Sequence, residues 1–480
     1  MKKLCAVLLC LSLLCAALVL PASAAETPRR PLVIVRGMDF TGGLSYDPGT
    51  PDQREATLQL DAKGVIKTVI TAFGRFVTGG KSAAIDEILD YASEALYVYG
   101  MTPDGDSADP AVSSFYYTAS AAEYPEFLTW RGSNEEGLLQ SSIERYGAEN
   151  VYFFKYDWRL DAGENAVYLN DLIETACRDH GADKVDLVCC SMGGIVTLAY
   201  MNDYGCGRLD SVVANSSTMG GTVVTTELMQ KKVYFDDGAA YRWLQSKLPK
   251  YNVLWSFAKK TGLVKGVCKF INFFAENHID EVYDRVITPT FGSMPAIWEL
   301  VQPDEYETAK EIMFGGREDE YAGLLAKTDR IQREVVSRRV ELLQSAMDEG
   351  VKITFIAGYN TPLTPAYPGA VYQGDGTLET ACMSLGALTS EIEKTLSDED
   401  LAVGEAKYVS PDKCVNASTC AFPEYTWFIR DVPHVGCLYG SDYTELIFRM
   451  LELDTQPTVR TWSEFPQFTV ADGSQNLTAQ

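Results

Sequence analysis

The chain has 480 residues, 46% of them hydrophobic, and a formal net charge of −25 at pH 7. This length and apolar content suffice for a large core, in one elaborated domain or two to three ordinary ones. A chain this acidic lacks the basic surface that nucleic-acid binding needs, and its overall charge argues against electrostatic docking on anionic lipid, although not against apolar contact with lipid.

The first 24 residues have the three parts of a secretory signal peptide. Lys2 and Lys3 form a short basic start, residues 4–20 are an apolar run, and residues 22–24 (ASA) have the small-residue pattern of a cleavage site. We therefore expect cleavage near Ala24 and an exported protein, located outside the cell, at its surface or in the periplasm. An uncleaved anchor is the alternative, because the apolar run is at the lower limit for a membrane span.

After residue 31, the apolar pattern alternates between strands and helices. Strands are predicted at residues 32–35, 151–156, 185–190 and 209–214. Helices are predicted at residues 65–77, 83–99, 135–146, 165–180 and 193–204. This order is typical of an α/β fold with a mostly parallel central sheet.

The pattern changes between residues 220 and 349, where helical stretches rich in Lys, Glu and aromatic residues replace the strands. We predict that residues 220–349 are a helical cap or lid, inserted into a core made of residues 25–219 and 350–453. The core resumes with a strand at 351–358 and, after a strand at 426–429, ends with a helix at 441–453. Residues 454–480 are predicted to be a C-terminal tail, either docked or frayed.

Residues 185–196 indicate a buried strand, a sharp turn with Ser191 at its tip, and the start of a helix. The turn matches the nucleophile elbow G-x-S-x-G, which exposes a serine hydroxyl at the end of a sheet, except that Cys189 replaces the first glycine. Open α/β sheets bind ligands at the carboxyl ends of their strands. An ordinary strand–Ser–helix turn is the alternative that this pattern alone leaves open.

A serine hydroxyl becomes a good nucleophile when a base lies within hydrogen-bonding reach and an acid orients that base. The chain has three histidines. His180 is predicted to end a helix at the opposite edge of the sheet, and His278 to be solvated in the cap. His434 lies between the last strand and the last helix, where the chain order Ser, acid, His puts the base. We predict His434 as the base.

Asp375 is the predicted acid. It follows the strand at 351–358, and a glycine on either side allows a tight loop that points the carboxylate at the imidazole. An ordinary Gly-Asp-Gly turn is one alternative, and Asp431, three residues before His434, is a competing acid.

An oxyanion hole needs two backbone N–H groups. One should be that of Met192, directly after the serine. The other should be that of Met38 or Asp39, in the loop after the first core strand, where Gly37 allows a close approach. We predict no metal site, since the nine cysteines that follow the signal peptide do not have the spacing of a zinc site. The proposed chemistry needs no cofactor.

The elbow and three further segments together resemble the lecithin–cholesterol acyltransferase family, which includes phospholipid:diacylglycerol acyltransferases and a lysosomal phospholipase. The three segments are residues 156–160 (YDWRL), 292–295 (GSMP) and 374–377 (GDGT). They occur in the family's order, and the resemblance spans most of residues 32–451. The chain departs from the family at Cys189 and at residues 36–39 (RGMD), where the family has P-G-x-x.

The resemblance implies an α/β-hydrolase fold with Ser191 as the acyl acceptor, Asp375 and His434 as its partners, and Trp158 in or near the acyl or oxyanion site. It also implies a lipid ester as substrate, either a phospholipid or an acylglycerol. The aromatic residues of the cap, Trp298 among them, would suit an acyl chain, although such residues more often form the core of a cap.

We therefore expect an exported serine acyl hydrolase or O-acyltransferase that acts on lipid esters through an acyl-serine intermediate. Water or an alcohol would accept the acyl group, and contact with a lipid surface would be transient. Two alternatives remain at this stage. One is a carboxylesterase for non-lipid substrates, and the other is a non-catalytic surface or binding protein on a hydrolase scaffold.

Overall fold

The computed structural model describes residues 30–40, 43–56, 68, 71, 75, 81–129 and 135–480. The predicted signal peptide, residues 1–24, and most of the helix predicted at residues 65–77 lie outside these ranges. Among the described residues, none of the helices combines the length and the apolar character that crossing a bilayer requires.

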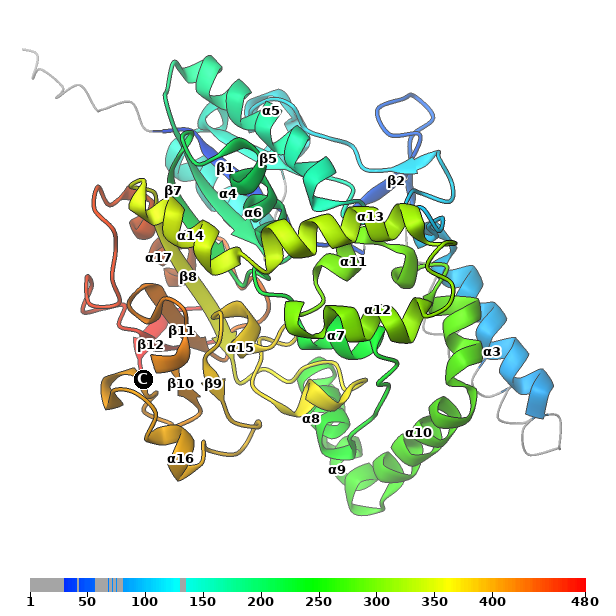
Figure 1. Ribbon diagram of the computed structural model, residues 1–480. Helices are drawn as coiled ribbons and strands as arrows, with labels where there is room; N and C mark the ends of the chain where they lie inside the picture. The colour runs from blue at the N-terminus through cyan, green and yellow to red at the C-terminus, as the bar shows by residue number, and fades with distance from the viewer. Residues whose placement is uncertain are drawn as a thin grey trace, which may run out of the picture.

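An eight-stranded sheet forms the centre of the protein (Figure 1). In spatial order its strands are β13 (Leu477–Ala479), β12 (Phe468–Ala471), β11 (Thr426–Arg430), β8 (Lys352–Tyr359), β7 (Leu209–Asn215), β6 (Val185–Cys190), β1 (Leu32–Val35) and β5 (Val151–Phe154). All neighbours are parallel except β12 and β13, which are antiparallel. The predicted α/β class with a mostly parallel sheet is confirmed.

Helices cover both faces of this sheet. Val33 and Val35 of β1 belong to one buried cluster with residues of α5 (Ala162–His180) and α6 (Gly193–Tyr204). Leu32 and Ile34 belong to a second cluster with residues of α4 (Glu135–Tyr146) and α17 (Asp442–Glu452). The clusters alternate along the strand because successive side chains point to opposite faces. Burial on both faces explains why these strands are continuous apolar runs in the sequence.

The direction in which strands are added reverses at β1. This strand has β5 on one side and β6 on the other, and β7 and β8 then follow beyond β6. Such a reversal separates the loops at the carboxyl ends of two neighbouring strands and leaves a crevice that open α/β sheets use for ligands. Here the two loops are those after β1 and β6, so the topology itself places the elbow serine beside the loop that carries Gly37.

Between β7 and β8, the chain forms a series of helices. They are α7 (Val223–Met229), α8 (Asp237–Lys247), α9 (Asn252–Lys260), α10 (Leu263–Val282), α11 (Pro295–Glu299), α12 (Tyr306–Phe314), α13 (Ala322–Ile331) and α14 (Arg339–Asp348). The long amphipathic stretch of the sequence at residues 318–347 is divided, since a π-helical turn at Gln332–Val336 separates α13 from α14. Figure 1 shows α13 and α14 crossing the core, with α9 and α10 at the end of the molecule opposite α5. The division into cap and core at residues 220 and 349 stays a prediction.

Smaller elements complete the fold. A three-stranded sheet contains β2 (Leu44–Tyr46), β3 (Arg54–Ala56) and β4 (Val112–Ser113), and a two-stranded sheet contains β9 (Leu388–Thr389) and β10 (Val415–Asn416). The remaining α-helices described are α3 (Lys81–Leu96), α15 (Thr380–Met383) and α16 (Asp398–Leu401). Residues 454–480, predicted to be a tail beyond the core, include β12 and β13 and extend the main sheet at one edge. Their sequences, FTVA and LTA, lack the continuous apolar run that marks the four-residue β1, LVIV.

Candidate active site

Ser191 lies between β6 and α6, at the carboxyl end of the strand. Its φ of 51° is in the left-handed region, which is costly for a residue with a side chain. The backbone of the turn is held by neighbours: the Ser191 N–H donates to the Asn215 carbonyl at 3.2 Å, and its carbonyl accepts from the Thr218 N–H at 3.0 Å. A strained serine fixed in this way is the local geometry of a nucleophile elbow.

The loop after β1 lies directly against the elbow. A Cβ built on Gly37 would lie 2.6 Å from Ser191 Cβ, and one built on Gly193 would lie 2.7 Å from the Val35 carbonyl oxygen. Neither position has room for a side chain. The two glycines therefore allow β1, its loop and the start of α6 to approach one another closely.

Cys189, the departure from the elbow pattern, is accommodated in the core. Its Sγ lies 3.8 Å from the Val213 carbonyl oxygen and 3.9 Å from Ser217 Oγ, and the residue is fully buried. Burial raises the pKa of the Cys189 thiol to about 12 and that of the neighbouring Cys190 well above its usual value. Both thiols are therefore protonated at neutral pH, and we assign them to packing.

The structure brings the three predicted residues of the triad together. His434 Nε2 lies 2.9 Å from Ser191 Oγ, and His434 Nδ1 lies 2.6 Å from Asp375 Oδ2. With the proton on Nδ1, the ring donates to Asp375 and accepts from the serine hydroxyl. This is the relative arrangement of nucleophile, base and acid in a serine hydrolase.

The Asp375 carboxylate is fixed by its own loop. Oδ1 accepts hydrogen bonds from the backbone N–H groups of Thr377 and Leu378, at 3.0 and 2.9 Å, which leaves Oδ2 for the imidazole. The competing Asp431 is exposed, and its Oδ1 accepts from Asn360 Nδ2 at 2.6 Å. The geometry therefore favours Asp375 over Asp431 as the partner of His434.

Opposing effects set the pKa of His434. Burial of the ring lowers the pKa, whereas the Asp375 carboxylate, through its charge and its hydrogen bond, raises it. Glu135 also raises the pKa of His434 and Lys247 lowers it, and the net shift is upward from the usual value. The sequence patterns did not point to Glu135 or Lys247, because both reach the site only through the tertiary fold.

The two other histidines are elsewhere. His180, at the end of α5, is close to the Glu149 carbonyl oxygen, 3.0 Å from its Nε2. His278 lies within α10, with Nδ1 3.6 Å from Glu281 Oε2. Neither contacts Ser191 in the described part of the chain.

Main-chain donors are available near Ser191 for an oxyanion. In the described part of the chain, neither the Met192 N–H nor the Met38 N–H has a hydrogen-bond acceptor. The Gly37 N–H, one residue before Met38, donates to Glu135 Oε1 at 3.4 Å. Asp39 is buried, and Trp158 Nε1 donates to its carbonyl at 3.0 Å. The N–H groups predicted for the oxyanion hole thus lie in the loops that meet at the elbow.

Trp158 supports the loop after β1. Its ring packs against Phe40 and Tyr99, with centroids 5.0 and 5.4 Å away, in addition to the hydrogen bond to Asp39. The residue is 1% exposed. Next to it in the chain, Asp157 and Arg159 form a fully buried ion pair at 2.8 Å. The YDWRL segment therefore shapes the loop, and direct contact of Trp158 with substrate stays a prediction.

Trp298 is inside the insertion. It is completely buried, its Nε1 donates to the Gly292 carbonyl at 2.8 Å, and its ring packs against Tyr306 and Phe314. This environment favours a packing role over the predicted contact with an acyl chain, because no part of the ring is open to a ligand in this structure.

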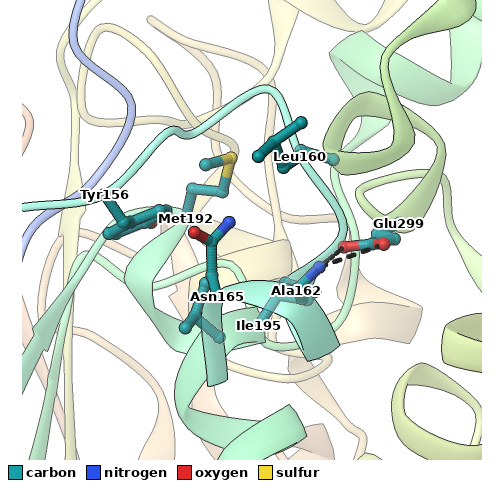
Figure 2. Close-up of a pocket in the computed structure, with 9 residues that line it drawn as sticks. Tyr156, Leu160, Ala162, Asn165, Met192, Ile195 and Glu299 are labelled. Carbon is teal, nitrogen blue, oxygen red and sulfur yellow. Dashed lines mark hydrogen bonds between the residues drawn. The ribbon is translucent and has the colours of Figure 1, made fainter. Parts of the chain in front are cut away.

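Met192 is one of the residues that line a small cavity next to the elbow (Figure 2). Figure 2 shows the Met192 side chain between Tyr156 and Leu160, with Glu299 of α11 reaching the start of α5 on the other side. The Glu299 carboxyl oxygens lie 3.3 and 3.0 Å from the Ala162 N–H, which donates to them. Burial, with the Asp161 carboxylate beside it, raises the pKa of Glu299 well above its usual value. Through these hydrogen bonds, Glu299 connects the insertion to the helix that follows the YDWRL segment.

The comparison with protein families agrees with this site. The family model described as lecithin:cholesterol acyltransferase matches residues 141–233, a range that includes both the YDWRL segment and the elbow. This match confirms the resemblance predicted from the motifs. A search of curated proteins found no match. Among solved structures, "The crystal structure of Tle4-Tli4 complex" is similar at 12% identity and a TM-score of 0.36, over 89% of this chain and 100% of that chain.

Proposed function

We propose that the chain whose residues 141–233 match the lecithin:cholesterol acyltransferase model is a serine acyl hydrolase or O-acyltransferase that acts on lipid esters. The hydrogen-bonded series Ser191, His434 and Asp375 carries the proposal. It supports an enzyme over a binding protein on the same scaffold, since a binding protein would need neither the strained serine nor the buried carboxylate.

In the proposed acylation step, Ser191 Oγ attacks the ester carbonyl carbon while His434 Nε2 takes the hydroxyl proton. The Asp375 carboxylate holds the ring and stabilises the imidazolium. The carbonyl oxygen becomes an oxyanion, which accepts hydrogen bonds from the Met192 N–H and from the N–H of Met38 or Asp39. When the tetrahedral intermediate collapses, the C–O bond to the leaving alcohol breaks and His434 returns the proton to that alcohol.

In the second step, water or an alcohol attacks the acyl-serine. His434 takes a proton from the attacking oxygen and gives it to Ser191 Oγ as the acyl–serine bond breaks. Water yields a fatty acid and an alcohol yields a new ester. Both outcomes use the same residues, so the reaction class depends on which acceptor reaches the acyl group.

Two observations support a lipid ester as the substrate class. The matched family model is named for a lecithin acyltransferase. The triad is also largely enclosed, since Asp375 and Ser191 are 1% and 9% exposed, as suits a reaction with an apolar acyl group. A phospholipid or an acylglycerol is the proposed substrate, and export through the N-terminal signal peptide is part of the proposal.

A panel of esters tests the function. Wild-type protein and Ser191→Ala are incubated with a phospholipid, a triacylglycerol and a short-chain soluble ester, with and without a long-chain alcohol, and the products are identified by mass. Free fatty acid or a new ester from the lipids, absent with Ser191→Ala, is the expected result. Cleavage of the short-chain ester alone would indicate a non-lipid carboxylesterase, and no turnover of any ester would favour a non-catalytic protein.

A further inference from the structure

Two helices of the insertion, α9 and α10, leave large apolar side chains in solvent. Six of these side chains are between 48% and 88% exposed: Val253, Leu254, Phe257, Leu263, Val267 and Phe273. They come from two consecutive helices at one end of the molecule (Figure 1). Soluble monomers rarely expose so many large apolar groups together, and such patches mark sites of contact with another surface.

The packing of the two helices explains why these side chains point outward. The pair is attached to α8 through small residues, since Ala258 of α9 and Val264 and Cys268 of α10 form a buried cluster with Ala240. Further along α10, Phe274 and Val282 pack against a buried cluster that includes residues of α3. Only a narrow stripe of each helix is therefore buried against the rest of the protein. The large apolar side chains contribute little to the core, so folding alone does not account for them.

The charge of this region is opposite to that of the whole chain. Residues 238–275 contain no Asp or Glu but seven basic residues: Arg242, Lys247, Lys250, Lys259, Lys260, Lys265 and Lys269. Arg242 is 3.5 Å from Glu393. In the described part of the chain, none of the five lysines from Lys250 to Lys269 has a carboxylate partner.

We propose that the α9–α10 pair docks on a lipid bilayer that contains anionic lipid. Exposed apolar side chains flanked by lysines without carboxylate partners, on amphipathic helices, are the combination that lies in a bilayer interface, with the apolar groups among the acyl chains and the lysines at the anionic headgroups. A symmetric contact between two copies fits less well, because a two-fold interface would oppose the lysines of one copy to those of the other.

The position of the α9–α10 pair relative to the triad is consistent with docking on a bilayer. Lys247, the last residue of α8, has its Nζ 3.9 Å from the Cβ position of Gly376, next to the catalytic acid Asp375. The charge of Lys247 also acts on His434. Since α9 begins at Asn252, five residues after Lys247, a bilayer in contact with the pair would lie close to the side of the site that carries Asp375. The inference deepens the proposed function, because the bilayer would supply the ester, but the docking can be measured without turnover.

The test measures binding of the full chain to vesicles of phosphatidylcholine alone and of phosphatidylcholine with phosphatidylglycerol, by flotation. Wild type should bind the anionic vesicles and bind the neutral ones at least several-fold more weakly. Each lysine near an anionic surface contributes about fivefold to binding. If the four contributions are independent, Lys259→Gln/Lys260→Gln/Lys265→Gln/Lys269→Gln should bind the anionic vesicles roughly 600-fold more weakly. Leu254→Ser/Phe257→Ser/Phe273→Ser should also lose binding.

Val340→Ser/Val403→Ser is the matched control, because both side chains are exposed, by 41% and 38%, and lie outside α9 and α10. All proteins share the same N-terminus, so the apolar run at residues 4–20 cannot cause a difference between them, and unchanged circular dichroism shows that the variants fold. Equal binding of wild type to neutral and anionic vesicles would overturn the proposal. So would α9–α10 variants that bind anionic vesicles as tightly as the control does. So would self-association of wild type that the Ser variants abolish without any effect on vesicle binding.

Ser191→Ala separates this inference from the proposed function. The variant should bind anionic vesicles as wild type does, since Ser191 is remote from α9 and α10 in sequence and is nearly buried. Vesicle binding by a wild type that hydrolyses no ester would remove the proposed function and leave the docking surface. Ester hydrolysis without vesicle binding would leave the proposed function and remove the docking surface.

Discussion

Ser191, Asp375 and His434 follow β6, β8 and β11, three parallel strands whose carboxyl ends meet at one edge of the sheet. Each side chain is held by a local feature: the strained turn for Ser191, two backbone N–H groups for Asp375, and the Asp375 carboxylate for His434. Pre-organisation of this kind lowers the cost of reaching the transition state, because the groups need not be ordered during the reaction.

Replacing the acid tests this geometry. In Asp375→Asn, the turnover of a soluble ester should fall by about 10⁴-fold at neutral pH, because an amide neither fixes the right tautomer nor stabilises the imidazolium. Wild-type activity should rise with pH as neutral His434 forms, through a pKa that lies above the usual histidine value. In Asp375→Asn, the rise in activity should occur at lower pH, because the carboxylate that raises the pKa of His434 is gone. The measurement is kcat/KM as a function of pH.

Asp431→Asn is the control for this substitution. Asp431 is exposed, has a positive φ that asparagine tolerates, and contacts Asn360 instead of His434. Its loss should change kcat/KM less than threefold, a margin of roughly 0.6 kcal/mol. A larger loss for Asp431→Asn than for Asp375→Asn would reverse the assignment of the acid.

The loop after β1 can be tested with one methyl group. In Gly37→Ala the new Cβ would lie 2.6 Å from Ser191 Cβ, so the loop must move and take the Met38 N–H with it. Displacing one oxyanion donor costs about 10²- to 10³-fold in kcat, and we expect a loss of this size with a folded protein. Gly207→Ala, where a Cβ would meet nothing within 4 Å, should retain wild-type activity. Equal activity of both variants would exclude the loop from the site.

The triad could be predicted from the sequence because chain order and flanking glycines restrict the choice. Ser191 follows an apolar strand, Asp375 lies between two glycines, and only one of three histidines falls between the predicted strand at 426–429 and the helix at 441–453. The charges of Glu135 and Lys247 on His434 could not be predicted in this way. They come from the start of α4 and the end of α8, and no local pattern connects these helix ends to the site.

At the scale of elements, segments with a long helical period or a continuous apolar run were predicted closely, and short strands without such a run were not. The helix expected at residues 165–180 begins at Ala162, because Asp161 caps it by accepting from the Glu164 N–H. The strands at 468–471 and 477–479 were missed, since neither is a continuous apolar run like the one at 32–35. Nothing in the helical period of residues 318–347 marked the π-helical turn that separates α13 from α14.

The contact between α11 and α5 leads to a prediction about stability. Burial and the Asp161 carboxylate raise the pKa of Glu299, so the folded state holds a proton that the unfolded state loses near pH 4.5. The free energy of unfolding should therefore fall as pH rises from that value through the raised pKa, by up to about 1.4 kcal/mol per pH unit. Glu299→Gln keeps the shape without the titration, and its unfolding free energy should fall less steeply.

Urea unfolding of both proteins over a series of pH values measures this difference. The amide introduced by Glu299→Gln can accept from the Ala162 N–H and donate to Asp161, so we expect no loss of stability at mildly acidic pH. Identical pH slopes in wild type and variant would show that Glu299 is ionised in the folded protein.

At the scale of the whole molecule, average charge is a poor guide to local surfaces. The net charge of −25 argued against electrostatic contact with anionic lipid, yet residues 238–275 carry seven basic residues and no acidic one. The acidic residues elsewhere in the chain suit solubility, whereas the α9–α10 pair combines lysines with exposed Val253, Leu254 and Phe257. Only the structure shows that these apolar residues face solvent, because their helical spacing alone also fits a buried helix face.

The central claim is that Ser191 is the nucleophile of an acyl-transferring enzyme. The most direct measurement is labelling of the folded protein with a long-chain fluorophosphonate, followed by mass mapping of the adduct. The account predicts one adduct, on the peptide that contains Ser191, formed faster as pH rises and His434 becomes neutral, and absent from Ser191→Ala. A folded wild type that does not react, or a Ser191→Ala variant that is labelled as fast as wild type, would contradict it.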